Sequence, residues 1–248
     1  MKENCRIAIV TGGARGIGRA VAMAFAAKGI GTVIADIDLD TAEKTAGEIR
    51  AMDVEAVAIR VDMSRNDDIV SLVDETVRRF GRLDILVNNA GILSTTPYDQ
   101  ISVAEWDRVL DINLTGIMFA SREALRPMQA QGWGRVISIS SLAGRNGGIS
   151  VGPAYVASKA ALIGLTRHLA KMVARKGITV NAVAPGPTET DIMKGFTEEQ
   201  MATLNESIPL GRLGKPEEIA QTVAFLASEA AAFITGVVID ANGGIYMG

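Results

Sequence analysis

The sequence has very little cysteine and histidine. Cys5 is the only cysteine and His168 the only histidine among its 248 residues. A single cysteine excludes a disulfide bond within the chain and fits a reducing compartment, so we expect a cytoplasmic protein. A single histidine argues against histidine-based catalysis and against most zinc sites, and we expect no metal. We expect His168 itself to lie on the flank of a helix.

The sequence also lacks an excess of basic residues and a long apolar run. Its formal net charge is −3 at pH 7, so the composition does not indicate a nucleic-acid partner. No uninterrupted apolar run reaches the ~20 residues of a membrane span. Residues 1–6 lead into the first expected strand without the apolar region of a signal peptide. We therefore expect neither a nucleic-acid-binding nor a membrane protein.

Apolar residues are abundant and occur in a regular alternation. They make up 48% of the chain, enough for one large domain over residues 1–248, and no linker or repeat divides it. Short β-branched runs alternate with helical patterns. This alternation predicts an α/β fold, a doubly wound parallel sheet of about seven strands with helices on both faces. We expect strands near residues 6–11, 31–36, 56–61, 83–88, 134–140, 177–183 and 236–240, and helices near residues 16–28, 39–51, 66–80, 102–127, 154–175 and 216–227.

A glycine-rich turn connects the first expected strand to the first expected helix. Gly12, Gly16 and Gly18 have the spacing G-x-x-x-G-x-G. Glycines let the backbone approach a pyrophosphate, and the free N–H groups at the start of the helix can bind it. A glycine turn can be merely structural, but the strand-turn-helix order indicates cofactor binding.

An acidic residue follows at the end of the second expected strand. Asp36 comes 18 residues after Gly18, where a carboxylate can accept hydrogen bonds from the adenosine ribose. Its charge would repel a 2′-phosphate, which favours NAD over NADP. Arg15 in the glycine turn could instead reach a phosphate. We give Asp36 more weight because it stands where the ribose should lie, although such an aspartate can also simply cap the next helix.

Tyr155 and Lys159 are four residues apart in an Ala-rich stretch with helix propensity. Both side chains therefore project from one face of a helix, one turn apart. A nearby ammonium favours the phenolate form of tyrosine, which could exchange a proton with an alcohol or ketone. Taken alone the pair is weak, because this spacing is common on helix surfaces.

The connection between the sixth expected strand and the last expected helix is long. Residues 188–210 combine acidic residues with Met193, Phe196 and Met201. A connection of this length in a compact domain is usually functional. We expect a mobile helical lid over the substrate, with plain surface packing as the alternative.

Several motifs occur together in the order of a known family. They are Thr11-Gly12-x-x-x-Gly16-x-Gly18, Asn88-Asn89-Ala90-Gly91, Tyr155-x-x-x-Lys159 and Pro185-Gly186-x-x-x-Thr190. Together they resemble the classical short-chain dehydrogenase/reductase family over essentially the whole chain, which implies a Rossmann-type fold. The end of the chain, from Pro209 to Met247, looks like the branch of bacterial 3-oxoacyl-carrier-protein reductases. Many sugar, polyol and steroid dehydrogenases share that end.

The resemblance implies a catalytic set. Tyr155 would be the acid/base, and Lys159 would bind the nicotinamide ribose and lower the pKa of Tyr155. Ser141 would hydrogen-bond the substrate oxygen, and Asn113 would help to hold a proton-relay water beside the lysine. Ser140 suits the serine role less well, because adjacent strand residues point in opposite directions. Without the resemblance, Asn113 and Ser141 read as ordinary polar loop residues.

The resemblance also implies the cofactor contacts. Asp62 and Met63 would border the adenine, and Thr188 and Thr190 would meet the nicotinamide carboxamide. Residues 89–91 follow the fourth strand at its carboxyl end, where open α/β sheets bind ligands. The expected cofactor-binding residues are Gly12, Arg15, Gly16, Ile17, Gly18, Asp36, Asp62, Met63, Asn89, Ala90, Gly91, Tyr155, Lys159, Pro185, Gly186, Thr188 and Thr190.

These motifs predict hydride transfer between NAD(H) and a secondary alcohol/ketone pair. Since an NAD pool is largely oxidised in cells, we expect oxidation of a small alcohol. Tyr155 stands 14 positions after Ser141, about one more than is common in the family, so one wall of the substrate pocket should differ. The alternatives are a 3-oxoacyl-carrier-protein reductase and, from another class, a non-catalytic dinucleotide sensor. A complete catalytic set argues against the sensor.

The sequence bears on two kinds of protein partner, a carrier protein and further copies of the chain. An acidic carrier protein would favour a basic surface near the mouth of the site. Only scattered candidates occur, namely Arg126, Arg135, Arg175 and Lys176, so carrier docking is possible but unsupported. The resemblance implies a homotetramer, with helices 102–127 and 154–175 at one interface and the C-terminal segment at another.

Overall fold

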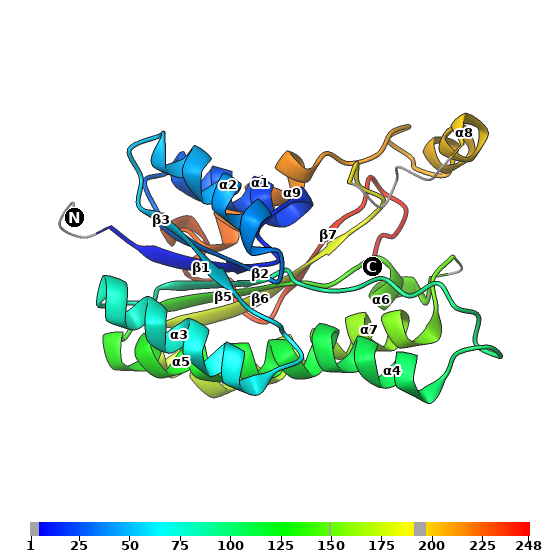
Figure 1. Ribbon diagram of the computed structural model, residues 1–248. Coiled ribbons are helices and arrows are strands. Elements are labelled where there is room, and N and C mark those ends of the chain that lie inside the picture. The colour runs from blue at the N-terminus through cyan, green and yellow to red at the C-terminus, as the bar shows by residue number, and fades with distance from the viewer. Residues whose placement is uncertain (1–4, 149, 191–196) are drawn as a thin grey trace.

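The protein is a parallel sheet between two layers of helices (Figure 1). The computed structural model describes residues 5–148, 150–190 and 197–248. Within these ranges the sheet has seven strands in the order β3-β2-β1-β4-β5-β6-β7, each parallel to its neighbours. The strands are β1 (Ile7–Thr11), β2 (Gly31–Asp36), β3 (Ala56–Arg60), β4 (Ile85–Asn88), β5 (Gly134–Ile139), β6 (Ile178–Pro185) and β7 (Val238–Ala241).

Each face of the sheet is covered by its own helices and has its own core. In β1, Ala8 and Val10 pack in one core, and Ile9 between them packs in the other, as the alternation of strand side chains requires. One face carries α1 (Gly16–Ala26), α2 (Leu39–Arg50) and α9 (Pro216–Leu226). The other carries α3 (Asn66–Phe80), α4 (Val103–Leu110), α5 (Gly116–Gln131) and α7 (Pro153–Val173). The predicted doubly wound sheet is confirmed.

Further short elements lie between or outside these layers. Helix α6 (Ala143–Asn146) follows β5, and α8 (Glu198–Glu206) stands apart from the sandwich in Figure 1. Short turns η2 (Ala174–Lys176) and η4 (Glu229–Ala231) precede β6 and β7. In the described ranges, no helix is long and apolar enough to cross a membrane.

One predicted helix differs from the structure. Residues 102–127 do not form one continuous helix, because a π-helical turn, η1 (Asp111–Thr115), separates α4 from α5. Helix α5 also continues past Pro127 to Gln131 and ends where Gly132 adopts a left-handed conformation with φ of 70°. The π turn is stabilised by contacts that Asn113 makes with a distant loop, which no local pattern encodes.

Candidate active site

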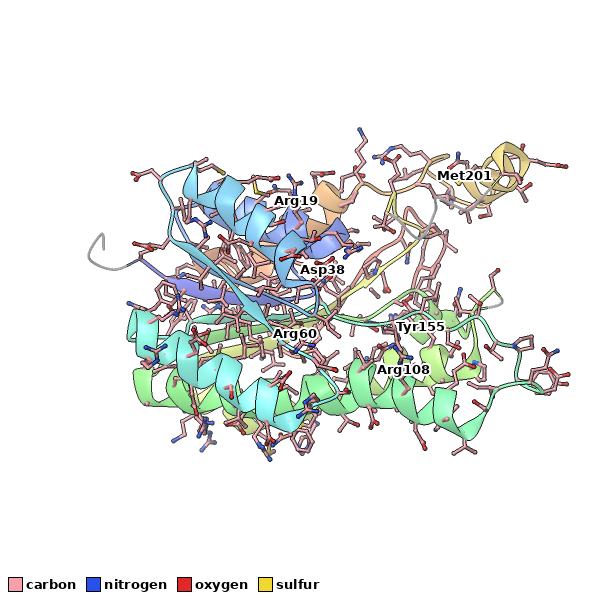
Figure 2. All side chains as sticks on the ribbon, in the orientation of Figure 1. Arg19, Asp38, Arg60, Arg108, Tyr155 and Met201 are labelled. Carbon is pink, nitrogen blue, oxygen red and sulfur yellow. The ribbon has the colours of Figure 1, made fainter. Side chains whose placement is uncertain are left out.

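The candidate site lies at the carboxyl edge of the sheet. Strands β1, β2, β4, β5 and β6 all deliver a predicted site residue within a few positions of their carboxyl ends. Tyr155, labelled in Figure 2, lies on the first turn of α7 beside this edge. This is the place where ligands bind in open parallel sheets. The topology therefore brings together segments that are far apart in the sequence.

The glycine turn is tightly packed and can admit a phosphate. Gly12 and Gly16 have positive φ angles of 63° and 54°, which favour glycine. A Cβ atom on Gly18 would stand 2.1 Å from the Gly12 carbonyl oxygen and 2.6 Å from the Asn89 side-chain nitrogen. Arg15 is the N-cap residue of α1, and its side chain accepts no hydrogen bond from the first N–H groups. Because these donors are uncapped, the turn fits an anionic pyrophosphate.

The loop after β4 is joined to this turn. The Asn89 side chain donates to the carbonyl oxygens of Thr11 and Gly12 at 3.0 and 2.9 Å. The Thr11 hydroxyl accepts from the backbone N–H groups of Asn89 and Ala90, both at 3.1 Å. Thr11 belongs to the first family motif but is not among the predicted site residues. Its position at the end of a buried strand, next to the turn, was the available signal.

Asp36 points at the glycine turn. Its carboxylate accepts from the Ala14 N–H and from the Asp38 N–H, both at 3.1 Å. The helix-capping alternative falls to Asp38, which accepts from the N–H and the hydroxyl of Thr41 at the start of α2. Those hydrogen bonds lower the pKa of Asp38. Arg15 forms an ion pair with Asp38 at 2.5 Å, so its guanidinium already has an anionic partner.

The two residues after β3 behave differently from each other. The Asp62 carboxylate accepts from the N–H and hydroxyl of Ser64 at 2.9 and 2.7 Å, and these bonds lower its pKa. Met63 is only 5% exposed, and its side chain packs in the core beneath α3 and α5. Ile17 likewise packs against the other core. If Met63 or Ile17 contacts a cofactor, it would therefore do so mainly through its backbone atoms.

Two hydroxyls meet at the centre of the site. The Ser141 hydroxyl interacts with the Tyr155 phenol and lowers its pKa, and the Ser141 Oγ accepts from the Ala143 N–H at 3.1 Å. The neighbouring Ser140 is buried and donates to the Lys159 carbonyl oxygen at 2.8 Å. The two serines therefore point in different directions, and Ser141 is the one that faces Tyr155.

Lys159 is buried one turn further along α7. Its Nζ donates to the Ile139 carbonyl oxygen at 2.8 Å and lies 5.7 Å from the centre of the Tyr155 ring. Burial lowers the pKa of Lys159 to about 8. Burial also raises the pKa of Tyr155, and the hydrogen bond with Ser141 offsets part of that rise. The expectation of a lowered Tyr155 pKa is wrong for this structure, because the loss of hydration outweighs the stabilising contacts.

Asn113 joins η1 to the loop that follows β4. Its side chain accepts from the Ile92 N–H at 2.8 Å and donates to the Ile92 carbonyl oxygen at 2.9 Å. It also donates to the Ser158 hydroxyl on α7 at 3.3 Å. A Cβ atom on Gly91 would stand 3.2 Å from the Asn113 Oδ1 and 3.4 Å from the Lys159 Nζ. The loop, η1 and α7 therefore converge on Lys159. Ser158 is not among the predicted site residues, because nothing in the sequence around it indicates a contact with Asn113.

The Pro185-Gly186 motif forms the opposite wall. The Thr188 hydroxyl donates to the Gly186 carbonyl oxygen at 2.9 Å. The Thr190 methyl group lies 3.6 Å from the place where a Cβ atom on Gly16 would stand. This wall therefore approaches the glycine turn. Met193 and Phe196 lie outside the described residues, whereas Met201 lies on α8, well separated from Tyr155 in Figure 2.

Comparisons with known proteins agree over the length of the chain. A family model described as enoyl-(acyl carrier protein) reductase matches residues 12–246. Cis-4-hydroxycyclohexanecarboxylate dehydrogenase of Sinomonas cyclohexanicum is 40% identical over 240 residues, covering 96% of both chains. The 3-oxoacyl-(acyl-carrier-protein) reductase FabG of Aquifex aeolicus is 41% identical over 248 residues, covering 99% of both.

Solved structures show the same arrangement. The crystal structure of gox2181 matches with a TM-score of 0.94 and 34% identity, covering 98% of this chain and 96% of that one. A short-chain type dehydrogenase/reductase from Mycobacterium marinum matches with a TM-score of 0.93 and 33% identity, again covering 98% and 96%. At these identities the likeness extends to the sequence as well as the fold.

Proposed function

This chain belongs to the short-chain dehydrogenase/reductase family, as an oxidoreductase that acts on CH–OH groups, and we propose that it oxidises a small secondary alcohol to a ketone with NAD. The observation that carries the proposal is the meeting of the Tyr155 and Ser141 hydroxyls beside buried Lys159. These groups lie at the edge of the sheet that also carries the glycine turn. The glycine turn can thus bind a dinucleotide, while the Tyr155 hydroxyl can exchange a proton with the substrate.

The protein's own part in the reaction is to position the alcohol and move its proton. Ser141 would donate a hydrogen bond to the substrate oxygen, and Tyr155 would take the proton from the hydroxyl. Lys159, with a pKa of about 8, is mainly an ammonium at neutral pH. Its Nζ lies 5.7 Å from the centre of the Tyr155 ring, on the same face of α7. Asn113 would hold the loop and a proton-relay water beside the lysine.

The residues at the carboxyl edge fit a nicotinamide dinucleotide. The uncapped glycine turn would hold the pyrophosphate, Asp36 the adenosine ribose, and Thr188 and Thr190 the carboxamide. When bound, this cofactor supplies the acceptor for the hydride.

NAD is favoured over NADP by the charges around the ribose position. Asp36 presents a carboxylate toward the glycine turn. Arg15 could have favoured a 2′-phosphate, but it is engaged by Asp38. A 2′-phosphate would therefore meet two carboxylates and only one guanidinium that is already paired. This local balance supports a preference for NAD.

Reduction of a 3-oxoacyl thioester is the second candidate, because the relative from Aquifex aeolicus has that name. The positions and contacts of the basic residues considered for carrier docking argue against thioester reduction. Arg135 is 2% exposed and interacts with Glu229, and Arg126 pairs with Asp74 and Glu123. Arg135 is the second residue of β5, and Arg175 and Lys176 lie in η2, just before β6. They therefore lie at the amino edge of the sheet, away from Tyr155.

The proposed substrate class follows from the other relative. Its name specifies a ring carrying a secondary hydroxyl and a carboxylate, so cyclic hydroxy acids join the small polyols as candidates. We also propose a cytoplasmic homotetramer. Its support is the exposed small-residue side of α7, at Ala160, Ala161 and Gly164, and the fully exposed Phe233 near the C-terminal strand.

A direct comparison of activities tests the function. Purified enzyme would be assayed for NAD-dependent oxidation of polyols, sugars, cyclic secondary alcohols and hydroxy acids, and for NADH- and NADPH-dependent reduction of a 3-oxoacyl thioester. We expect one of the alcohols to have the highest kcat/KM. Efficient thioester reduction, with no alcohol within a hundredfold, would establish the second candidate instead. Tight NADH binding without turnover of any compound would support a dinucleotide sensor.

A further inference from the structure

Helix α6 connects Ser141 to the rest of the active site. The Ala143 N–H bonds the Ser141 hydroxyl, and the Leu142 N–H donates to the Pro185 carbonyl oxygen at 2.8 Å. A Cβ atom on Gly144 would stand 2.7 Å from the backbone of Lys159. The short helix therefore packs directly against the segment of α7 that carries the catalytic pair. A displacement of α6 would move Ser141 relative to Tyr155.

Arg145 extends from α6 to the end of the chain. Its guanidinium donates to the Asp240 carboxylate at 3.0 Å and to the Gly248 carbonyl oxygen at 3.4 Å. It also lies 4.8 Å from the centre of the Tyr246 ring, within the range of a cation–π interaction. All three partners belong to β7 or to the residues after it. Arg145 thus joins α6 to β7 and to the residues that follow it.

The ion pair is largely buried and incompletely satisfied. The Arg145 and Asp240 side chains are 13% and 15% exposed. Among the described residues, the Arg145 Nε and the Asp240 Oδ1 have no hydrogen-bond partner. A buried ion pair with unsatisfied atoms recovers its desolvation cost poorly, and an apolar pair would stabilise the fold as well or better. The role of the Arg145–Asp240 ion pair is therefore more easily explained by the position in which it holds α6 than by a gain in stability.

The residues after β7 also contact two other walls of the site. A Cβ atom on Gly186 would stand 2.8 Å from the Asn242 Cα. The Leu210 N–H donates to the Gly243 carbonyl oxygen at 3.1 Å. The Asn242 side chain folds this segment by bonding the backbone of Tyr246. One short segment thus contacts α6, the loop after β6 and the segment after α8.

We propose that Arg145 is a positioning residue for Ser141, and that residues 246–248 complete its anchorage. Arg145 holds α6 against β7 and the chain end, and α6 in turn presents the Ser141 hydroxyl to Tyr155 and to the substrate oxygen. This inference rests on the proposed alcohol oxidation. It adds that turnover depends on the last residues of the chain, about a hundred positions away from the serine in sequence.

Steady-state kinetics of four variants test the coupling. We expect Arg145→Met to lower kcat about tenfold with the best alcohol, while KM for NAD stays within twofold. Arg145→Lys should recover part of the loss, and deletion of residues 246–248 should reproduce it. Combining Arg145→Met with the deletion should be no worse than the more severe single change, since both remove one anchorage. Arg79→Met, which removes an exposed ion pair on α3, is the matched control and should keep wild-type kcat.

Hydrogen–deuterium exchange provides a readout that does not depend on turnover. Arg145→Met and the deletion should each increase exchange of the peptide covering residues 141–147 at least threefold, with no change in the glycine turn at residues 12–18. Unchanged exchange in residues 141–147, or kinetic losses that multiply in the combined variant, would overturn the proposal. If the wild type oxidises no alcohol, the proposed function fails, and the exchange experiment still decides the role of Arg145.

Discussion

At the scale of single residues, the site has to form a charged pair under unfavourable conditions. Burial raises the pKa of the Tyr155 phenol and lowers that of the Lys159 ammonium, so it disfavours the charged form of each. At Tyr155, the contact that opposes this effect is the one with the Ser141 hydroxyl. Removing that hydroxyl should therefore impair proton transfer without disturbing the sheet that positions it.

The two serines provide a test at this scale. Ser141→Ala should lower kcat at least a hundredfold, because it removes the hydroxyl that faces Tyr155. Ser140→Ala should cost far less activity, since that hydroxyl bonds the backbone of α7. Tyr155→Phe should nearly abolish turnover while NADH binding, followed by fluorescence, is retained. Activity of Tyr155→Phe within threefold of wild type would exclude it as the acid/base, and a reversed order of the serine variants would reassign the serine.

The buried lysine should leave a signature in the pH dependence of stability. The folded-state pKa of Lys159 is about 8, below its ordinary value of 10.5, so between these values the unfolded chain holds more protons. Stability contributed by this group therefore rises with pH across about pH 8 to 10.5. In Lys159→Met that contribution is absent.

We expect the unfolding free energy of wild type, relative to Lys159→Met, to increase by one or more kcal/mol between pH 7 and pH 9.5. Urea unfolding of both proteins at several pH values measures it, and Lys171→Met, on the exposed side of the same helix, is the control. A constant difference across this range would mean that Lys159 is not significantly desolvated.

At the scale of elements, the sequence predicts regular structure well because hydrophobic period and turn residues are local. Every strand end lies within two residues of its expected position, and so do the ends of α1, α2, α3, α7 and α9. The exception around η1 arises because Asn113 bonds Ile92, 21 positions earlier. Likewise α6, only four residues long, lies in a glycine-containing loop with too few residues for a helical period.

The family resemblance predicts most of the site residues, but it does not predict the side chains with which they interact. Arg15 lies in the turn between β1 and α1, and Asp38 lies in the turn between β2 and α2. Their pairing depends on two side-chain orientations that no spacing rule fixes. The contact between Ser141 and Tyr155 also depends on side-chain orientations. Strand alternation predicts only that Ser141 and Ser140 point in different directions. The anchorage of Arg145 at Asp240 spans 95 positions, which only the assembled sheet brings together.

The end of β2 and the turn that leads from it to α2 should control cofactor choice. Asp36→Ala should narrow or reverse an NAD preference of at least about tenfold, or about 1.4 kcal/mol, by removing both hydrogen bonds and repulsion. Asp38→Ala should raise kcat/KM with NADP severalfold while Asp36 remains, because it frees Arg15. Glu48→Ala, which breaks a neighbouring exposed pair with Arg19, should change neither value. A wild-type preference for NADP would show that Arg15 outweighs Asp36.

At the scale of the whole molecule, the two edges of the sheet differ in role. The reacting groups lie at its carboxyl edge, whereas the amino edge is closed by Arg6, Arg135 and Glu229 around Trp133. The long exposed side of α7 carries small residues in its middle, which allows two helices to approach closely. Assembly along α7 would leave the carboxyl edge open to substrate, and it would also brace the helix that bears Tyr155.

This view of α7 predicts the effect of a bulky residue on assembly. Gly164 is exposed, and nothing lies within 4 Å of the place where its Cβ atom would stand, so Gly164→Arg should leave the folded chain intact. If α7 helices pack together in a homotetramer, the arginine should split it into smaller species and lower activity by loosening Tyr155. Sedimentation velocity measures the masses, with Ser71→Arg on the exposed side of α3 as the control. A wild-type protein that sediments as a monomer, or an unchanged tetramer in Gly164→Arg, would contradict an interface on this side of α7.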